Sequence, residues 1–134
     1  MTVIEYLGEG SHDCPLVRLV TPTLLDVVSL RELAAFMSQR RESWYSLRDR
    51  DKYEIIGFSD FQLLSRDNRG LSIKGDAGYW ELSPKEWAHV SLLVDALADL
   101  PEDKGGYQWL SGPNSPEPLP DTGVSVVVSR DGQW

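Results

Sequence analysis

Short stretches in which apolar and polar residues alternate recur along the chain, and turn-forming residues separate them. This pattern predicts β-strands, because successive side chains of a strand point to opposite faces. The predicted strands cover 3–7, 16–20, 44–47, 53–56, 61–64, 71–73, 79–82, 107–110 and 124–129. In the second of them, Arg18 is expected to point away from the face that Val17 and Leu19 share. Between 53 and 82 the separators are about four residues long, which favours antiparallel pairing of consecutive strands.

The first predicted helix covers about 29–40. Ser29 and Glu32 form a capping-box pattern, in which a hydroxyl and a carboxylate satisfy free backbone amides at the helix start. The apolar residues behind this motif recur at helical spacing and form one stripe: Leu30, Leu33, Ala34 and Met37. The segment 23–28 is a candidate for an additional turn before Ser29.

The second predicted helix covers about 84–98. Ser83 is the expected N-cap, and Pro84 occupies the first helical position, where its missing amide hydrogen costs nothing. Glu86 completes the capping box. The apolar residues that follow again share one helical face: Trp87, Val90, Leu93, Val94 and Leu97.

These elements together predict an α+β fold in a single domain over 1–134. We expect a mostly antiparallel sheet of about five to seven strands, with both helices packed on one face. Four prolines between 111 and 122 predict an extended loop there.

The charge balance disfavours some classes of partner and favours another. The chain has 13 Lys and Arg residues against 21 Asp and Glu, a net charge of −8. Such a surface repels nucleic-acid phosphates and anionic lipid headgroups, so neither nucleic-acid nor membrane binding is expected. It attracts a basic surface, and a protein partner of that kind is expected. The oligomeric state does not follow from the sequence.

Cysteine usage and the distribution of apolar residues predict a cytoplasmic protein. Cys14 is the only cysteine, so an internal disulfide framework is excluded. No apolar run approaches the roughly 20 residues that span a bilayer. The first residues lack the basic start and the apolar core of a secretory signal.

One local cluster combines reactive side chains: His12, Asp13 and Cys14. An imidazole two residues from a thiol predicts an activated nucleophile of a small hydrolase, with Asp13 orienting the base. The same residues form half of a metal site that Glu9 or His89 would complete. The third interpretation is a turn in which Asp13 bonds backbone amides and Cys14 is a small buried residue. The turn is favoured, and no catalytic residue, metal or cofactor is predicted.

Aromatic residues are the preferred candidates for binding. Trp44 and Tyr45 are adjacent on one predicted strand, and Tyr79 and Trp80 are adjacent on another, so one member of each pair faces the open side of the sheet. Tyr107 and Trp109 are two residues apart and share a face. Exposed aromatic side chains are typical anchors of protein interfaces. The alternative is that these residues belong to the core and only their polar edges reach water.

Three segments resemble a group of small, uncharacterised bacterial proteins. They are GSHDCPLVRL at 10–19, GYQWL at 106–110 and the terminal SRDGQW at 129–134. The resemblance implies a bacterial single-domain protein and carries no activity, cofactor or site residue with it.

The sequence therefore favours a non-enzymatic, acidic protein-interaction domain, such as an immunity-like or antitoxin-like inhibitor or an adaptor. One alternative is a small hydrolase or metal-binding enzyme centred on His12, Asp13 and Cys14. A second alternative is a small-molecule sensor that uses the aromatic pairs.

Overall fold

The fold combines nine strands and two helices within the residues that the structure describes. The structure is a computed structural model that describes residues 1–8, 15–39, 43–48, 51–67, 69–100, 106–111 and 124–132. The strands are β1 (Thr2–Leu7), β2 (Leu16–Val20), β3 (Ser43–Ser46), β4 (Tyr53–Ile56), β5 (Asp60–Ser65), β6 (Gly70–Lys74), β7 (Ala77–Leu82), β8 (Tyr107–Ser111) and β9 (Ser125–Ser129). The helices are α1 (Leu24–Ser38) and α2 (Pro84–Ala98). The predicted α+β class is confirmed.

The nine strands form two mixed sheets instead of the predicted single sheet of about five to seven strands, and four of the seven neighbouring pairs are antiparallel. The five-stranded sheet has the order β4-β1-β2-β9-β8, and the four-stranded sheet has the order β3-β5-β7-β6. Three neighbouring pairs run parallel: β1 with β4, β2 with β9, and β5 with β7. In the predicted meander only β6 and β7 pair as consecutive strands. Strand β6 lies beyond β7, so β5 meets β7 from the other side and runs parallel to it.

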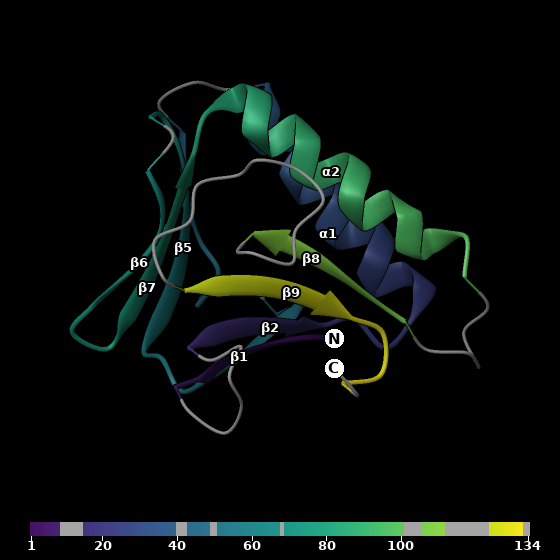
Figure 1. The fold of residues 1–134 in the computed structure, drawn as a ribbon, viewed down its shortest axis with the longest axis horizontal. Coiled ribbons are helices and arrows are strands. Elements are labelled where there is room, and N and C mark those ends of the chain that lie inside the picture. The colour runs from purple at the N-terminus through teal and green to yellow at the C-terminus, as the bar shows by residue number, and fades with distance from the viewer. Residues whose placement is uncertain are drawn as a thin grey trace.

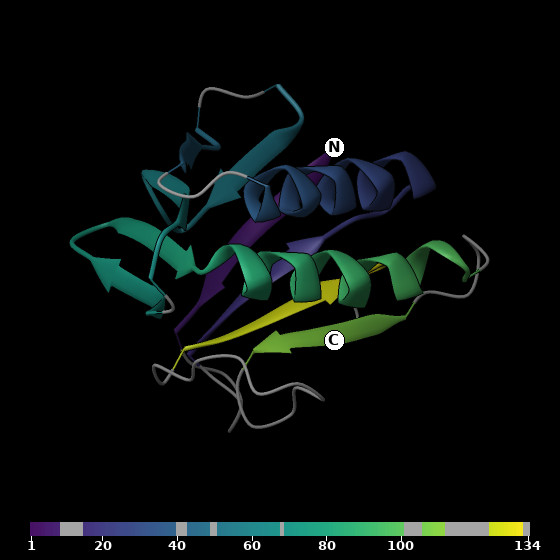
Figure 2. The ribbon, with the colours of Figure 1, turned by 90° about the horizontal axis from the view of Figure 1, so that it is seen from above.

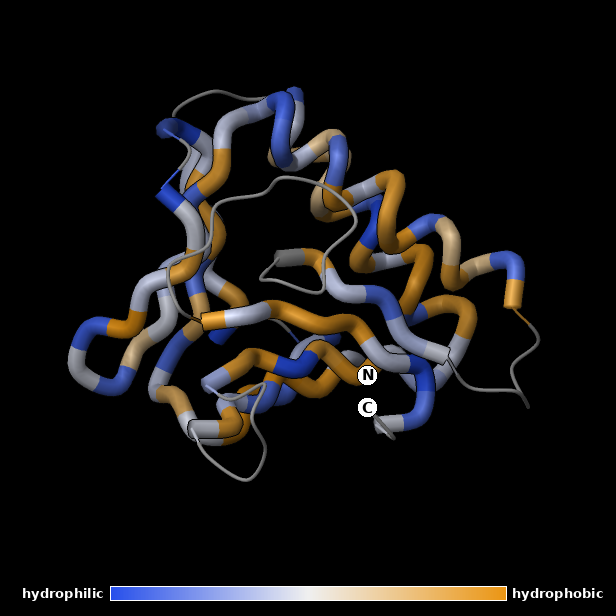
Figure 3. Tube along the Cα trace, viewed as in Figure 1, coloured by the Kyte–Doolittle hydropathy of each residue, from blue (hydrophilic) through white to orange (hydrophobic). Residues whose placement is uncertain are grey.

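The two helices lie side by side over one face of the five-stranded sheet, as Figure 2 shows. The four-stranded sheet stands at one end of this layer, on the left of Figure 1. The main core lies where the helices meet the inner faces of both sheets. Figure 3 shows how the apolar residues of β9 continue along the strand through this region. The described residues contain no helix other than α1 and α2, and neither of these is long and apolar enough to cross a bilayer.

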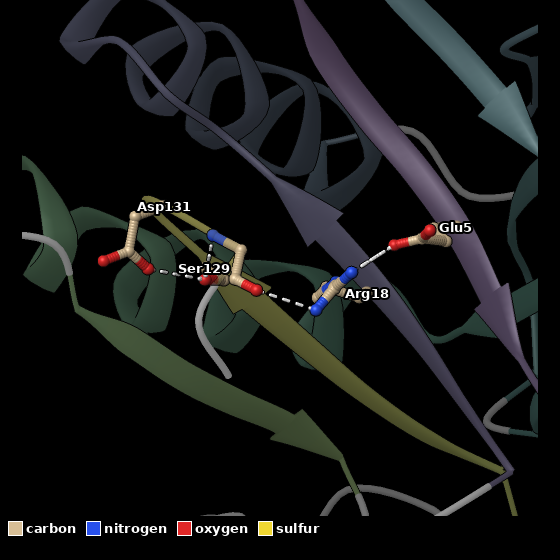
Figure 4. Close-up of polar contacts among 5 residues, drawn as sticks. Glu5, Arg18, Ser129 and Asp131 are labelled. Atoms are coloured by element: carbon tan, nitrogen blue, oxygen red, sulfur yellow. Dashed lines mark hydrogen bonds and ion pairs between the residues drawn. The ribbon is translucent and has the colours of Figure 1, made fainter. Parts of the chain in front are cut away.

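Strand alternation places Arg18 as predicted. Val17 and Leu19 are buried in the core, whereas Arg18 lies on the opposite face of β2. Its guanidinium donates to Glu5 Oε1 at 2.5 Å and to the backbone oxygen of Gly132 at 2.8 Å. Figure 4 shows this connection between β1, β2 and the turn that follows β9.

Helix α1 begins five residues before the predicted position, at Leu24 instead of Ser29. Thr23 is the N-cap, and its hydroxyl accepts a hydrogen bond from the Asp26 amide at 3.2 Å. The Asp26 carboxylate in turn accepts from the Thr23 amide. Two capping boxes follow each other in the sequence, at 23–26 and at 29–32, and the earlier one starts the helix because it allows Val27 to join the buried stripe. Helix α2 covers Pro84–Ala98, which confirms the second prediction.

We expect Thr23→Ala to destabilise the protein by about 1 kcal/mol, because it removes the side-chain acceptor of the N-cap. Ser29→Ala is the matched control. Ser29 lies inside α1, and alanine has the higher helix propensity, so its effect should stay within about 0.5 kcal/mol. Urea unfolding measures both changes. A larger loss for Ser29→Ala than for Thr23→Ala would contradict this assignment of the helix start.

Gly57 lies where the chain passes from β4 of one sheet to β5 of the other. Its φ of +88° is a conformation that L-residues with a side chain rarely adopt. The predicted Pro-rich loop at 111–122 lies outside the described residues, apart from Ser111 at the end of β8.

Candidate binding cleft

A cleft of about 650 Å³ opens beside α1, next to β3 and the start of β4. Its lining comes from three segments that are separate in the sequence. The described lining residues are Val28, Ser29, Glu32, Leu33, Phe36, Tyr45, Asp51, Lys52 and Tyr53. Its volume falls within the range of sites that bind small ligands or single side chains of a partner. Because three segments must meet to form it, the cleft depends on the fold and has no local sequence motif.

Three aromatic rings, Phe36, Tyr45 and Tyr53, form the apolar part of this cleft together with two aliphatic side chains, Val28 and Leu33. Phe36 and Tyr45 pack edge to face, with ring centroids 6.3 Å apart and an angle of 63° between the rings. Burial raises the pKa of the Tyr53 hydroxyl far above its usual value, and the nearby Tyr45 and Asp26 add to this shift. Tyr53 therefore stays neutral at physiological pH and is unsuited to act as an anion. Phe36 is 39% exposed although it belongs to a helix that packs on the core.

The charged groups of the cleft are two carboxylates, Glu32 and Asp51, and the ammonium of Lys52. Glu32 is exposed and accepts a hydrogen bond from Arg31 at 3.2 Å. The guanidinium of Arg31 also donates to Asp95 on α2 at 2.6 Å. The hydrogen bonds with Asp95 and Glu32 raise the pKa of Arg31. An exposed ion pair of this kind contributes little free energy, so an incoming cation can compete with Arg31 for Glu32 at low cost.

No family model, curated protein or solved structure matches this chain. The geometry of the cleft and its surroundings is therefore the basis on which a function is proposed below. The resemblance to small bacterial proteins stays a prediction.

The adjacent aromatic pairs split between the two faces of the four-stranded sheet. Trp80 is only 2% exposed and packs in the core, whereas Tyr79 lies half-buried on the outer face. Tyr45 faces α1 and lines the cleft, and Trp44 points outward with 60% of its surface exposed. The cleft thus contains Tyr45 alone of the six predicted aromatic residues.

The remaining two aromatic candidates lie on β8, far along the five-stranded sheet from β4. Trp109 is buried against Leu16 and Val127 on the face opposite the helices. Tyr107 is exposed. Neither lines the cleft, and together they form no joint surface with Trp44.

Trp44 is held in a defined orientation although it is exposed. Its indole Nε1 donates to Gln62 Oε1 on the neighbouring strand β5. Gln62 Nε2 donates to Asp60 Oδ2 at 2.8 Å. Asp60 is nearly buried and also accepts from Ser46 Oγ at 2.8 Å. A chain of hydrogen bonds therefore fixes an exposed ring to the body of the sheet.

The predicted reactive cluster of His12, Asp13 and Cys14 lies outside the described residues, so its alternatives stay predictions. His89, the proposed additional ligand, lies half-buried on α2. Among the described part of the chain, no group of three or more His, Cys, Asp or Glu side chains is arranged to hold a metal ion.

Sequence reasoning missed most of the cleft, including Glu32, Phe36, Asp51 and Tyr53. One signal was available. Phe36 lies outside the stripe that ends at Met37, and it is four residues after Glu32 and eight after Val28. An aromatic residue on the second face of a helix indicates a further contact surface. What covers or faces it could not be predicted, because Tyr45 and Tyr53 come from other elements.

Proposed function

We propose that this chain is a protein-interaction domain that binds a cationic side chain of a partner protein in the cleft beside α1. An inhibitor or adaptor of the cytoplasm, without catalytic activity of its own, would use such a site. The observation that carries the proposal is the combination of three aromatic rings with the carboxylates of Glu32 and Asp51 in one cleft.

The chemistry of the lining supports a lysine or arginine side chain as the guest. Aromatic faces attract cations by about 0.5–2 kcal/mol, and the same faces accept the methylene groups of a long side chain. Glu32 and Asp51 supply two negative charges to the lining, against the one positive charge of Lys52. The net charge of −8 would accelerate the encounter with a basic partner and would disfavour anionic ligands.

A small organic cation is the second candidate, and the volume of about 650 Å³ favours it, because free ligands occupy sites of this size. With a small organic cation as its ligand, the protein would be the small-molecule sensor that the sequence offered as an alternative. The two candidates differ in what surrounds the cation, since a protein partner also contacts the protein outside the cleft.

The test uses a basic pentapeptide, acetyl-Thr-Lys-Val-Lys-Thr-amide, titrated into ¹⁵N-labelled protein. We expect amide shifts around Glu32, Phe36 and Tyr45, and loss of binding when both lysines are acetylated. The double variant Glu32→Gln/Asp51→Asn should weaken binding by about threefold to thirtyfold, because each exposed charge pair contributes about 0.3–1 kcal/mol.

Two controls make this result specific. Asp76→Asn/Glu86→Gln removes the same number of charges from the β6–β7 turn and from the first turn of α2, and should leave the affinity nearly unchanged. Equal binding of the acetylated pentapeptide, or shifts away from the cleft, would refute the proposal. Butylammonium that binds as tightly as the basic pentapeptide would favour the small-molecule version instead.

A further inference from the structure

The outer edge of β3 offers backbone hydrogen-bonding groups next to the cleft. Strand β3 is the edge of the four-stranded sheet and pairs with β5 on one side. The Leu47 amide donates to the Phe61 oxygen at 3.0 Å, so Leu47 faces β5 with its backbone. In an antiparallel ladder this orientation alternates. Trp44 and Ser46 therefore point their N–H and C=O groups away from β5.

Strand β3 is short, with four residues, but it carries none of the charged side chains or prolines that protect many exposed edges. Natural edges carry lysine, proline, bulges or covering segments that prevent another chain from pairing with them. The sequence of β3 is Ser-Trp-Tyr-Ser, without a charge or a proline. Within the described residues, no strand pairs with β3 on its outer side. As far as the described residues show, the outer side of β3 can therefore take an added strand.

Each face of β3 presents an aromatic side chain that an added strand would contact. Tyr45 points to the cleft, and Trp44 points to the outer face, where Gln62 and Asp60 fix its indole ring. A strand added beside β3 would place alternate side chains beside Tyr45 and beside Trp44. Because the orientation of Trp44 is already fixed, its side chain loses less conformational entropy when a strand binds.

We infer that an extended, basic segment of a partner protein pairs with β3 and places a lysine or arginine in the cleft. This inference rests on the proposed function and adds the binding mode. Charge identifies the occupant: an added strand whose cleft-facing residues are cationic complements Glu32 and Asp51, which outnumber the one cation of the lining, Lys52. A second copy of this chain would bring another net charge of −8 to the same edge, and mutual repulsion disfavours it.

Substitutions at Ser46 test the role of the backbone. Ser46→Ala removes the Oγ hydrogen bonds to Asp60 and keeps the outward amide. Ser46→Pro loses the same hydroxyl and the outward amide as well, while the bonds from β3 to β5 remain, since proline is tolerated on the free side of an edge strand. We expect the basic pentapeptide to bind Ser46→Pro about threefold to tenfold more weakly than Ser46→Ala, the loss of one hydrogen bond.

A second measurement avoids any change to the protein. In antiparallel pairing, the central valine of the basic pentapeptide would share the face of Trp44 and direct its N–H toward β3, whereas both lysine amides would point away. N-methylation of the valine should therefore weaken binding by at least about threefold, the value of one hydrogen bond. N-methylation of a lysine should change it little. The comparison of the two N-methylated peptides tests strand pairing with β3 even if Ser46→Pro does not fold.

The outcomes separate the binding mode from the proposed function. If the pentapeptide binds the cleft, but the two Ser46 variants bind alike and N-methylation has no alternating effect, strand pairing is refuted and the proposed function stands. If the pentapeptide does not bind at all, the proposed function is refuted, and the binding mode that rests on it is refuted as well. If sedimentation shows a dimer of the free protein that Ser46→Pro dissociates, a second copy occupies the edge and the inference is overturned.

Discussion

Trp87→Ala is expected to cost about 3–5 kcal/mol of stability, the range for a buried tryptophan that is truncated to alanine. Trp87 is 1% exposed and lies on α2 where the helix meets the four-stranded sheet. Its ring packs edge to face against Trp80, with centroids 5.0 Å apart. Its Nε1 donates to the Leu64 oxygen at 2.9 Å. The substitution therefore leaves a cavity and removes one hydrogen bond to the Leu64 oxygen at the same place.

Two further variants separate these contributions. Trp87→Phe keeps a ring against Trp80 and loses the donor to Leu64, so its cost should be about 1–2 kcal/mol from that hydrogen bond. Trp44→Ala removes an exposed indole and should cost less than about 1 kcal/mol. Urea unfolding measures all three. A loss below about 2 kcal/mol for Trp87→Ala would show that this contact is not central to the core.

Such a loss is large because domains of this size are only marginally stable, with a free energy of unfolding of about 5–15 kcal/mol. Trp87→Ala would remove a substantial fraction of it, whereas cleft substitutions at exposed positions would not. Binding experiments on the cleft can therefore use variants that keep the fold.

Local patterns predicted the elements well where one signal dominated. The start of α2 follows from Ser83 and Pro84, and the observed helix has the predicted bounds. For α1, two successive capping boxes competed as the helix start, and the choice depended on Val27 reaching the core, which is a tertiary effect. Strand positions followed from alternation, as the opposite faces of Val17 and Arg18 illustrate.

Pairing and site geometry could not be predicted in the same way. The parallel pairs β2–β9 and β1–β4 join segments that are far apart in the sequence, and no local signal specifies them. The cleft requires Phe36 and Tyr45 to meet across α1 and β3. Adjacency correctly indicated that Trp44 and Tyr45 face opposite sides, but only the sheet order decides which of them lies next to α1.

Asp60 is expected to support stability only in its ionised form. Its carboxylate accepts hydrogen bonds from Ser46 Oγ and Gln62 Nε2, each at 2.8 Å, and from the backbone amides of Arg48 and Phe61. Burial alone would raise the pKa of Asp60, but these hydrogen bonds outweigh it and lower the pKa below 3.8. The stabilisation is fully present above about pH 4 and is lost as the pH falls through the lowered pKa.

Asp60→Asn should therefore destabilise the protein by about 2–3 kcal/mol at pH 7, because an amide group faces donors that need an acceptor. The difference from the natural chain should shrink as the pH falls through the lowered pKa of Asp60, where its carboxylate becomes protonated. Urea unfolding at pH 7, 4 and 3 measures this change. Glu54→Gln, at an exposed carboxylate on β4, is the control and should show neither the loss nor the pH dependence.

The same variant connects stability with the binding surface. Gln62 holds the indole of Trp44 and is itself held by Asp60, so Asp60→Asn should release the ring from its fixed orientation. The indole ¹⁵N–¹H signal of Trp44 would then shift toward that of a freely exposed tryptophan, and the basic pentapeptide would bind more weakly, while Glu54→Gln would change neither. Asp26 is a second carboxylate with a lowered pKa. Burial would raise this pKa, but hydrogen bonds from the Met1 α-amino group and from Thr23 outweigh burial. Asp26 is present in both variants, so its contribution cancels in the comparison. An unchanged Trp44 signal in a folded Asp60→Asn protein would show that the ring is positioned by its own packing and that the hydrogen-bond chain from Asp60 is incidental.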